Sequence, residues 1–338
     1  MILLSDSSCP PVAPVPPGTQ RPRWSVMIPT YRGTRHLRVT LESVLAQAPS
    51  ASEMQIEVID DGSPDTSAQE LITKLAGERV AFFRKPENQG LVANFNTCIE
   101  RARGEYVHIL HDDDAVLPGF YQTMGSVLGE DQSVGAAFSR FVAIDGHDRW
   151  CYVSPLLFQT SRVLDNPALQ IARRNLVRTP SIVVRRAVYE RIGGFNKRIS
   201  HTADWEMWVR IAAHFEIWYE ERPLALYREH AGSDTSNLAR SGENLRQIRK
   251  AIDIFREYLP ETIRPGCRGL GHAWAVIIGW HTFKALLSKG DWRSGTRVLL
   301  ETARCFPRPD EALHGYLLES KLRRASRAEA QDFANADR

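Results

Sequence analysis

Short apolar runs alternate with helix-like segments through the first 120 residues, and this alternation restricts the possible folds more than any other feature of the sequence. Buried strands of apolar, β-favouring residues are expected at 24–33, 56–65, 80–83 and 106–110. The segments between them have apolar residues at helical spacing. Strands and helices in this order predict an α/β fold with a mostly parallel, Rossmann-like central sheet flanked by helices.

Polar residues follow three of these strands: 29–32 after the first, Asp60 and Asp61 at the second, and an Asp-Asp-Asp run at 112–114 after the fourth. Ligands of doubly wound sheets bind outside the carboxyl ends of the strands, where these residues are expected to lie. Each segment alone is equally typical of a βα turn, and the acidic run alone of a solvated surface. Three strand ends that carry polar residues and meet at one edge of the sheet instead predict a binding site. Its carboxylates suit Mg²⁺ or Mn²⁺.

Two widespread nucleotide-binding motifs are missing from the sequence. The first strand is not followed by Gly-x-Gly-x-x-Gly, which argues against a dinucleotide-binding dehydrogenase. No Gly-x-x-x-x-Gly-Lys-Ser/Thr occurs either, which argues against a P-loop ATPase. If the ligand carries phosphates, a metal held by carboxylates must offset their charge.

Charge and cysteine usage limit the remaining possibilities. A net charge of +3 is too small to argue for a nucleic-acid partner. The five cysteines form no Cys-x-x-Cys pair, which argues against zinc and a disulfide framework and favours a reducing cytoplasm. The N-terminus lacks the basic and apolar segments of a signal peptide, and no apolar run approaches the ~18 residues of a membrane span.

Three regions are expected along the chain. Residues 1–23 are rich in proline and should form a disordered tail. Residues 24–236 form the α/β domain, and 237–338 form a C-terminal all-helical extension with helices at 244–259, 273–287, 291–305 and 311–324. The basic end of that extension is either a solvated face or a surface for a homodimer or for the inner face of the plasma membrane. Its cationic residues are Lys321, Arg323, Arg324 and Arg327.

Four motifs follow one another in the α/β domain: Ser-Val-Met-Ile-Pro-Thr-Tyr-Arg at 25–32, Val-Ile-Asp-Asp-Gly-Ser at 58–63, Asn-Gln-Gly at 88–90 with Asn96, and Leu-His-Asp-Asp-Asp at 110–114. In this order and spacing they resemble family 2 glycosyltransferases of the GT-A fold, and the resemblance covers about 24–236. It implies an inverting enzyme that uses a nucleotide sugar and a divalent cation, Mn²⁺ or Mg²⁺.

The resemblance also implies roles for individual residues. Asp61 is expected near the base of the nucleotide, and Asp113, then Asp112, then Asp114 are the expected metal ligands. His111 stands where many members have the first Asp of Asp-x-Asp-Asp, so which two carboxylates bind the ion stays open. His230, in Tyr-Arg-Glu-His at 227–230, is a further candidate ligand. The implied nucleotide-sugar contacts are Pro29, Thr30, Tyr31, Arg32, Asp60, Asp61, Gly90, Asn94 and Asp112.

Asp204 is the candidate catalytic base. It begins an amphipathic helix in Ala-Asp-Trp-Glu-Met-Trp at 203–208, where an Asp can simply cap the helix. In the family, the Asp of such an Asp-Trp-Glu pattern deprotonates the acceptor. Glu206 points away from Asp204 on a helix and is expected to contact something else. Arg228 is expected to brace the site by pairing with an acidic neighbour.

The resemblance therefore implies transfer of a hexosyl or related sugar from a UDP- or dTDP-sugar to a glycan, lipid-linked or other hydroxyl acceptor. A role in bacterial surface polysaccharide or glycoconjugate synthesis is expected, in the cytoplasm or at the membrane. Two alternatives remain. A sugar-1-phosphate nucleotidyltransferase would need a Gly- and Arg-rich loop after the first strand, which 29–34 does not supply. A non-catalytic nucleotide-sugar- or carbohydrate-binding protein could share the fold.

Overall fold

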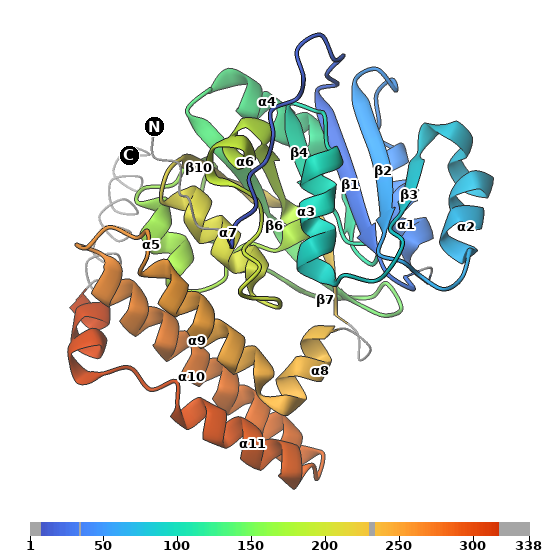
Figure 1. Ribbon diagram of the computed structural model, residues 1–338. Helices are drawn as coiled ribbons and strands as arrows, with labels where there is room; N and C mark the ends of the chain where they lie inside the picture. Colours follow the sequence, from blue (N-terminus) through green and yellow to red (C-terminus); the bar gives the residue numbers. More distant parts are fainter. Residues whose placement is uncertain (1–7, 34, 230–233, 318–338) are drawn as a thin grey trace, which may run out of the picture. The chain divides into compact units, whose positions relative to one another are not determined.

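The computed structural model describes residues 8–33, 35–229 and 234–317, arranged in two compact units. The first unit comprises 1–167 and 176–233, and the second comprises 168–175 and 234–338 (Figure 1). One boundary between the units lies at 233, and the sequence placed the start of the helical extension at 237. The short segment 168–175, which the sequence placed in the α/β domain, belongs to the second unit.

The expected parallel strands form one half of the sheet in the first unit. β2 pairs with β1 and β3, and β1 pairs with β4, all in parallel. The alignment of Thr30 with Asp60 brings the ends of β1 and β2 to one edge, as predicted. These strands are β1 (Trp24–Thr30), β2 (Met54–Asp60), β3 (Ala81–Arg84) and β4 (Tyr106–Ile109).

The other half of the sheet is mixed. β9 lies antiparallel between β4 and β6, and β6 then pairs in parallel with the long strand β10. Ala225 and Leu226 of β10 pair with β5, the short strand that directly follows the acidic run. The sheet order is β3-β2-β1-β4-β9-β6-β10-β5, with β7 on β6 and β8 on β10. The bounds are β5 (Ala115–Val116), β6 (Val134–Asp145), β7 (Trp150–Val153), β8 (Arg162–Val163), β9 (Ile182–Arg185) and β10 (Glu216–Glu229).

Helices cover both faces of the sheet, because the strands are apolar on both sides. Val26 and Ile28 of β1 belong to a buried cluster with Leu41 of α1, Ile72 of α2 and Phe120 of α4. α3 contacts β1, β2 and β4 and lies in front of the sheet in Figure 1. The bounds are α1 (Leu37–Leu45), α2 (Ser67–Ala76), α3 (Leu91–Arg101), α4 (Phe120–Glu130), α6 (Arg186–Ile192) and α7 (Ala203–Ala212).

The described part of the proline-rich segment, 8–23, differs from the disordered tail that the composition predicted. The backbone carbonyl of Ser8 accepts a hydrogen bond from Lys197 N (2.8 Å), and that of Pro10 accepts one from Gly194 N (2.8 Å). Arg186 Nη2 donates to Ala13 O at 2.9 Å. Proline prevents regular structure here, but an extended chain keeps its carbonyls free to bond to the domain surface.

The second unit is helical in its described part. α10 is much longer than predicted, because its N-terminal glycines lie inside the helix instead of ending it. Residues 309–317 are also helical, and the rest of the helix predicted at 311–324 lies outside the described residues, as do the four basic residues at 321–327. The bounds are α5 (Pro167–Ala172), α8 (Asp234–Ser241), α9 (Glu243–Phe255), α10 (Arg264–Ser288) and α11 (Trp292–Ala303). Among the described residues, no helix has the length and apolar character needed to cross a bilayer.

Candidate active site

The acidic run occupies a tight turn between β4 and β5. Thr30, the last residue of β1, donates its hydroxyl to Asp112 Oδ2. Gly33 lies so close to this carboxylate that a Cβ on it would collide with Asp112. Asp112 is therefore turned toward the β1 turn.

Asp114 is buried, with 1% of its surface exposed. Its Oδ1 accepts a hydrogen bond from the backbone N–H of Arg228 at 2.8 Å, and its carbonyl accepts one from Thr40 Oγ1 at 2.7 Å. Oδ2 accepts no hydrogen bond within the described residues, and its nearest ionic neighbour is His111 Nδ1 at 3.5 Å. A buried carboxylate oxygen without a hydrogen bond is costly, which marks this atom as a candidate ligand.

Arg228 fixes this turn from the end of β10. Its Nε donates to the carbonyl of Asp113 at 2.7 Å, and its Nη1 donates to the carbonyl of Asp145 at 2.9 Å. It also forms an ion pair with Asp148 at 2.7 Å. The structure therefore contains the pairing with an acidic neighbour that was expected of Arg228, and the guanidinium shapes the acidic turn.

His111 lies within the carboxylate cluster. Its ring stacks on Phe95 of α3 with a centroid distance of 5.4 Å. Burial by itself would lower the pKa of His111, but the nearby carboxylate of Asp114, with the charge of Asp113, raises it to about 9. His111, Asp113 and Asp114 each place a ligand atom within 4.8 Å of the others. Asp112 is not part of this group, although the sequence ranked it above Asp114 and did not predict His111 as a ligand.

Crowding raises the pKa values of two of the carboxyl groups. Burial and the charge of Asp113 raise the pKa of Asp112 to about 7 and that of Asp114 to about 6. Both shifts reflect negative charge held close together in a poorly solvated place. Two carboxylates and an imidazole are a donor set that Mn²⁺ accepts, and Asp114 Oδ2 still lacks a hydrogen bond. The residues therefore fit the divalent cation that the sequence predicted.

The turns after β1 and β2 are bonded to each other through Ser63. Its hydroxyl accepts from the backbone N–H of Arg32 at 2.8 Å and donates to Asp60 Oδ1 at 2.5 Å. Arg32 has a φ of 56°, which is unusual for a residue other than glycine and makes this turn a strained one. Asp60 is buried and also pairs with Arg84, so its carboxylate holds the two turns together. Tyr31 between them is exposed.

Asp61 joins the end of β2 to the start of α3. Lys85 donates to its Oδ1 at 2.6 Å, and the backbone N–H groups of Gln89 and Gly90 donate to the carboxylate, the latter at 2.8 Å. Asn94, one turn into α3, donates its amide to Ile59 O at 3.0 Å. Gln89 N–H reaches both carboxylate oxygens at 3.2 Å, so Asp61 accepts four hydrogen bonds in all and is buried.

Asp204 is the second residue of α7 and is partly exposed. Its Oδ1 accepts the backbone N–H of Trp205 at 2.7 Å. A chain of ring contacts connects this helix to the acidic turn. The ring of Trp208, one turn after Asp204, lies 6.2 Å from that of Phe195 between centroids. The rings of Phe195 and Phe95 are 4.9 Å apart between centroids, and Phe95 stacks on His111.

Glu206 has the structural role that its helix position predicted. It is fully buried and pairs with Arg210 through two contacts of 3.0 and 3.1 Å. Arg210 also donates to the carbonyls of Ile192 and Gly194. Asn96, part of the third sequence motif, hydrogen bonds to both the N–H and the C=O of Phe195.

The structure thus brings together most of the residues that the sequence singled out: the turns after β1 and β2, the start of α3 and the acidic turn. His230 lies outside the described residues. Sequence reasoning did not predict Lys85 as a partner of Asp61, Thr30 as a donor to Asp112, or His111 as a ligand. A lysine directly after a short strand and a histidine before three aspartates were the available signals.

A sequence model of the glycosyl transferase family 2 matches residues 25–193, half of the chain. The chain belongs to glycosyltransferase family 2. It is 31% identical over 238 residues to the uncharacterized protein MT1568 of Mycobacterium tuberculosis, covering 67% of this chain and 73% of the relative. Relatives named uncharacterized glycosyltransferases in Rickettsia species are matched over as little as 32% of their own length.

Solved structures of other glycosyltransferases share the fold. Staphylococcus aureus TarS 1–349 in complex with UDP-GlcNAc superposes with a TM-score of 0.65 at 16% identity, over 86% of this chain and 83% of TarS. The mannosyltransferase PcManGT of Pyrobaculum calidifontis, in complex with GDP-Man and Mn²⁺, superposes with a TM-score of 0.53 at 18% identity, over 95% of this chain and 86% of PcManGT. This family 2 glycosyltransferase therefore has the GT-A fold, and family and fold together support glycosyl transfer from a nucleotide sugar.

Proposed function

We propose that this family 2 glycosyltransferase transfers a sugar from a nucleoside-diphosphate donor to an acceptor hydroxyl, with inversion at the anomeric carbon. The observation that carries the proposal is the edge of the sheet where the turns after β1 and β2, the start of α3 and the acidic turn lie together. Ligands of doubly wound sheets bind at this edge. We favour UDP- or dTDP-sugars, and the TarS neighbour holding UDP-GlcNAc supports a uridine donor.

The nucleotide lies over the turns after β1 and β2 in this proposal. Asp61, which Lys85, Gln89 and Gly90 hold in place, is the predicted neighbour of the base. The exposed ring of Tyr31 offers a stacking surface. The predicted contacts also include Pro29, Thr30, Arg32, Asp60, Gly90, Asn94 and Asp112.

A divalent cation, Mn²⁺ or Mg²⁺, would be held by His111, Asp113 and Asp114, with Asp112 beside them. The buried oxygen of Asp114 that lacks a hydrogen bond and the raised pKa values of Asp112 and Asp114 support this assignment. PcManGT, which shares the fold, holds Mn²⁺ in its solved structure. When bound, such a cation offsets the negative charge that develops on the departing diphosphate. His230 remains a predicted further ligand.

Asp204 is the proposed base. It takes the proton from the acceptor hydroxyl, whose oxygen then attacks the anomeric carbon from the side opposite the diphosphate. The ring contacts from Trp208 to His111 support this role, because they tie the helix of Asp204 to the metal turn. A single displacement of this kind inverts configuration and forms no covalent enzyme intermediate.

The acceptor is proposed to be a glycan, a lipid-linked glycan or another hydroxyl compound, used on the cytoplasmic side in bacterial surface polysaccharide or glycoconjugate synthesis. This assignment rests on the class of enzyme and on relatives from bacteria.

A panel of nucleotide sugars tests the proposal without knowledge of the acceptor. Melting temperature and slow release of free nucleotide are measured with Mn²⁺, with Mg²⁺ and with a chelator. A matching donor at 100 times its dissociation constant should stabilise the protein by about 2.7 kcal/mol, a rise of a few degrees. The rise and the slow hydrolysis should both require the metal. If no nucleotide sugar changes the melting temperature with either metal, the proposed donor site is wrong.

A further inference from the structure

The outer face of α11 combines apolar and basic side chains. Trp292, Thr296, Leu299 and Ala303 are spaced so that they share one side of the helix, and all are exposed. Trp292 is 67% exposed, and the neighbouring Leu300 is 59% exposed. A soluble helix normally turns such residues toward a core, whereas here they form the exposed apolar strip of α11.

A row of arginines borders this strip. Arg293, Arg297 and Arg304 follow one another at helical spacing on the adjoining side, and all three are exposed. Arg293 and Arg297 form no ion pair within the described residues. No acidic side chain lies on the outer face of α11.

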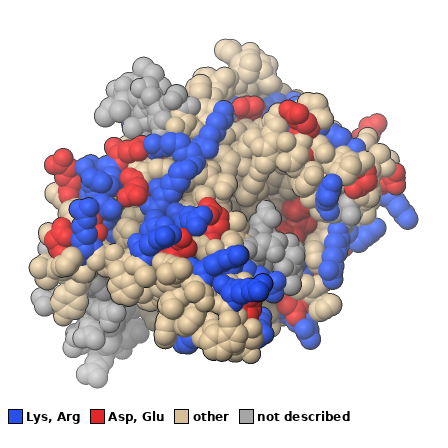
Figure 2. Space-filling model, turned by 60° about the horizontal axis from the view of Figure 1, so that its bottom comes forward, with Lys and Arg blue, Asp and Glu red and all other residues tan. Residues whose placement is uncertain are grey.

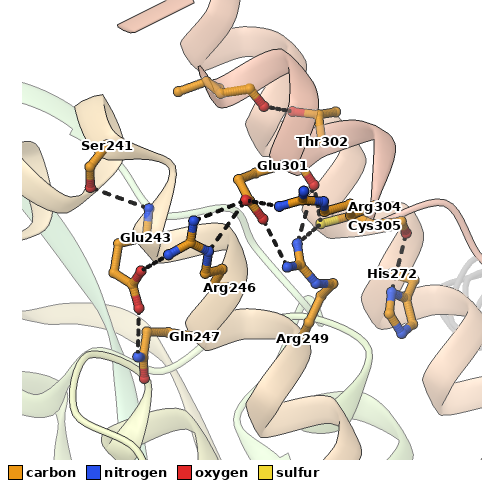
Figure 3. A network of polar contacts seen from close by, with 11 residues as sticks. Ser241, Glu243, Arg246, Gln247, Arg249, His272, Glu301, Thr302, Arg304 and Cys305 are labelled. Atoms are coloured by element: carbon orange, nitrogen blue, oxygen red, sulfur yellow. Dashed lines mark hydrogen bonds and ion pairs between the residues drawn. The ribbon is translucent and has the colours of Figure 1, made fainter. Parts of the chain in front are cut away.

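The single acidic residue within α11 is turned inward. Glu301 is 3% exposed and pairs with Arg246 (3.2 Å), Arg249 (2.8 Å) and Arg304 (2.5 Å), as Figure 3 shows. Three guanidinium groups around one carboxylate leave an excess of positive charge at this side of the unit. The inner side of α11 is thereby fixed, which keeps the apolar strip facing outward.

Charge is divided unequally between the two units. The described residues of the second unit contain fifteen Lys and Arg but nine Asp and Glu. Those of the first unit contain 23 Lys and Arg and 26 Asp and Glu. Lys and Arg also form extended groups on the face drawn in Figure 2. More exposed aromatic side chains follow α11 or lie on α10: Trp280 (48%), Phe306 (67%) and Tyr316 (70%).

We propose that the outer face of α11 binds the surface of an anionic lipid bilayer. A helix with exposed aromatic and aliphatic residues beside a basic row lies in the plane of such a surface, where its apolar side enters the headgroup boundary and its arginines meet lipid phosphates. Tryptophan and tyrosine favour this interfacial zone. A second copy of this chain fits less well, because each arginine row would face another without an acidic partner on the outer face.

Vesicle co-sedimentation of the full chain, without nucleotide sugar, tests the proposal. The protein should bind vesicles containing phosphatidylglycerol, bind phosphatidylcholine vesicles weakly, and lose affinity with added salt. Arg293→Gln with Arg297→Gln should weaken binding about 30-fold, at about one kcal/mol for each arginine near the surface. Trp292→Ser with Leu300→Ser should weaken it at least about tenfold. The matched control, Lys250→Gln with Arg256→Gln, removes the same charge from exposed positions on and beside α9 and should change binding less than about twofold.

Three results would overturn the proposal: no binding of the native chain to anionic vesicles, equal weakening by the control pair, or a native dimer that the α11 variants dissociate while vesicle binding stays unchanged. The arginine variant should hydrolyse donor in lipid-free solution at the native rate, so loss of membrane binding and failure of the proposed transfer can be told apart.

Discussion

The carboxylate of Asp114 differs from that of Asp112 in what surrounds it, and a matched pair of substitutions measures the difference. Asp114 Oδ2 lies in the group with His111 and Asp113, whereas Asp112 Oδ2 accepts the hydroxyl of Thr30. Asp114→Asn and Asp113→Asn should each weaken Mn²⁺ binding at least about tenfold, because each removes a charged ligand. Asp112→Asn should weaken it less than Asp114→Asn. Calorimetric titration with Mn²⁺ checks this, and a larger loss for Asp112→Asn would place the ion nearer Thr30.

His108 on β4 makes stability depend on pH. Its ring is buried between Tyr121 Oη (3.1 Å) and Pro180 O (3.0 Å), and burial lowers its pKa to about 3. The unfolded chain takes up a proton near pH 6.5 but the folded chain does not, so stability is complete above pH 6.5 and falls as the pH drops toward 3. Between pH 7 and 5 this residue alone should cost about 2 kcal/mol.

His108→Gln removes the titrating group and can still form hydrogen bonds. Chemical denaturation at pH 7 and pH 5 should show a smaller loss in His108→Gln than in the native chain, by about 2 kcal/mol. Equal losses in both proteins would mean that His108 is protonated in the folded state.

One side-chain amide, that of Asn96, attaches helix α3 to the segment between α6 and α7. Asn96 accepts from Phe195 N–H at 2.7 Å and donates to Phe195 C=O at 3.1 Å, and all of these groups are buried. Asn96→Ala leaves two buried backbone groups without a partner, which should destabilise the fold by about 2–4 kcal/mol. Thr97→Ala, one residue further on the same helix, removes only a bond to Ala93 O and should cost less than about 1 kcal/mol. Denaturant titration of both variants checks this, and equal costs would contradict the role of Asn96.

The strands at the site could be predicted from the sequence, whereas one long helix could not. β1, β2 and β4 are runs of β-favouring residues bounded by Pro, Asp or Gly, so the residue preferences and the strand ends indicate the same elements. α10 was expected to begin at Ala273 but begins at Arg264, with Gly269 and Gly271 inside the helix. A Cβ on Gly269 would collide with the carbonyl of Glu311, so glycine is there for close packing.

The side-chain partners within the site were less predictable than its location. Residues following neighbouring parallel strands must meet at one edge, so the presence of the acidic turn near Asp60 and Asp61 follows from topology. That His111, instead of Asp112, groups with Asp113 and Asp114 depends on the tight turn and on Arg228, which lies over 110 residues away in sequence. No local pattern contains that information.

The first unit contains the residues that show the family and the candidate active site, whereas the proposed lipid-binding face lies on the second unit. The sequence suggested a basic membrane or dimer surface at 321–327, outside the described residues. The structure instead offers the exposed apolar strip of α11 and its arginine row, which only appear once the inward side of the helix is known.

Asp204 is proposed to remove the acceptor proton, and Asp204→Asn measures whether it does. The substitution keeps the size of the side chain and its hydrogen bond from Trp205 N–H but cannot take up a proton. Asp165→Asn, which changes an exposed carboxylate in the bend before α5, is the matched control. We expect Asp204→Asn to bind nucleotide sugar and Mn²⁺ within about threefold of the native enzyme while turnover falls about 10²–10⁴-fold. Retained turnover in Asp204→Asn, with donor binding intact, would contradict the account.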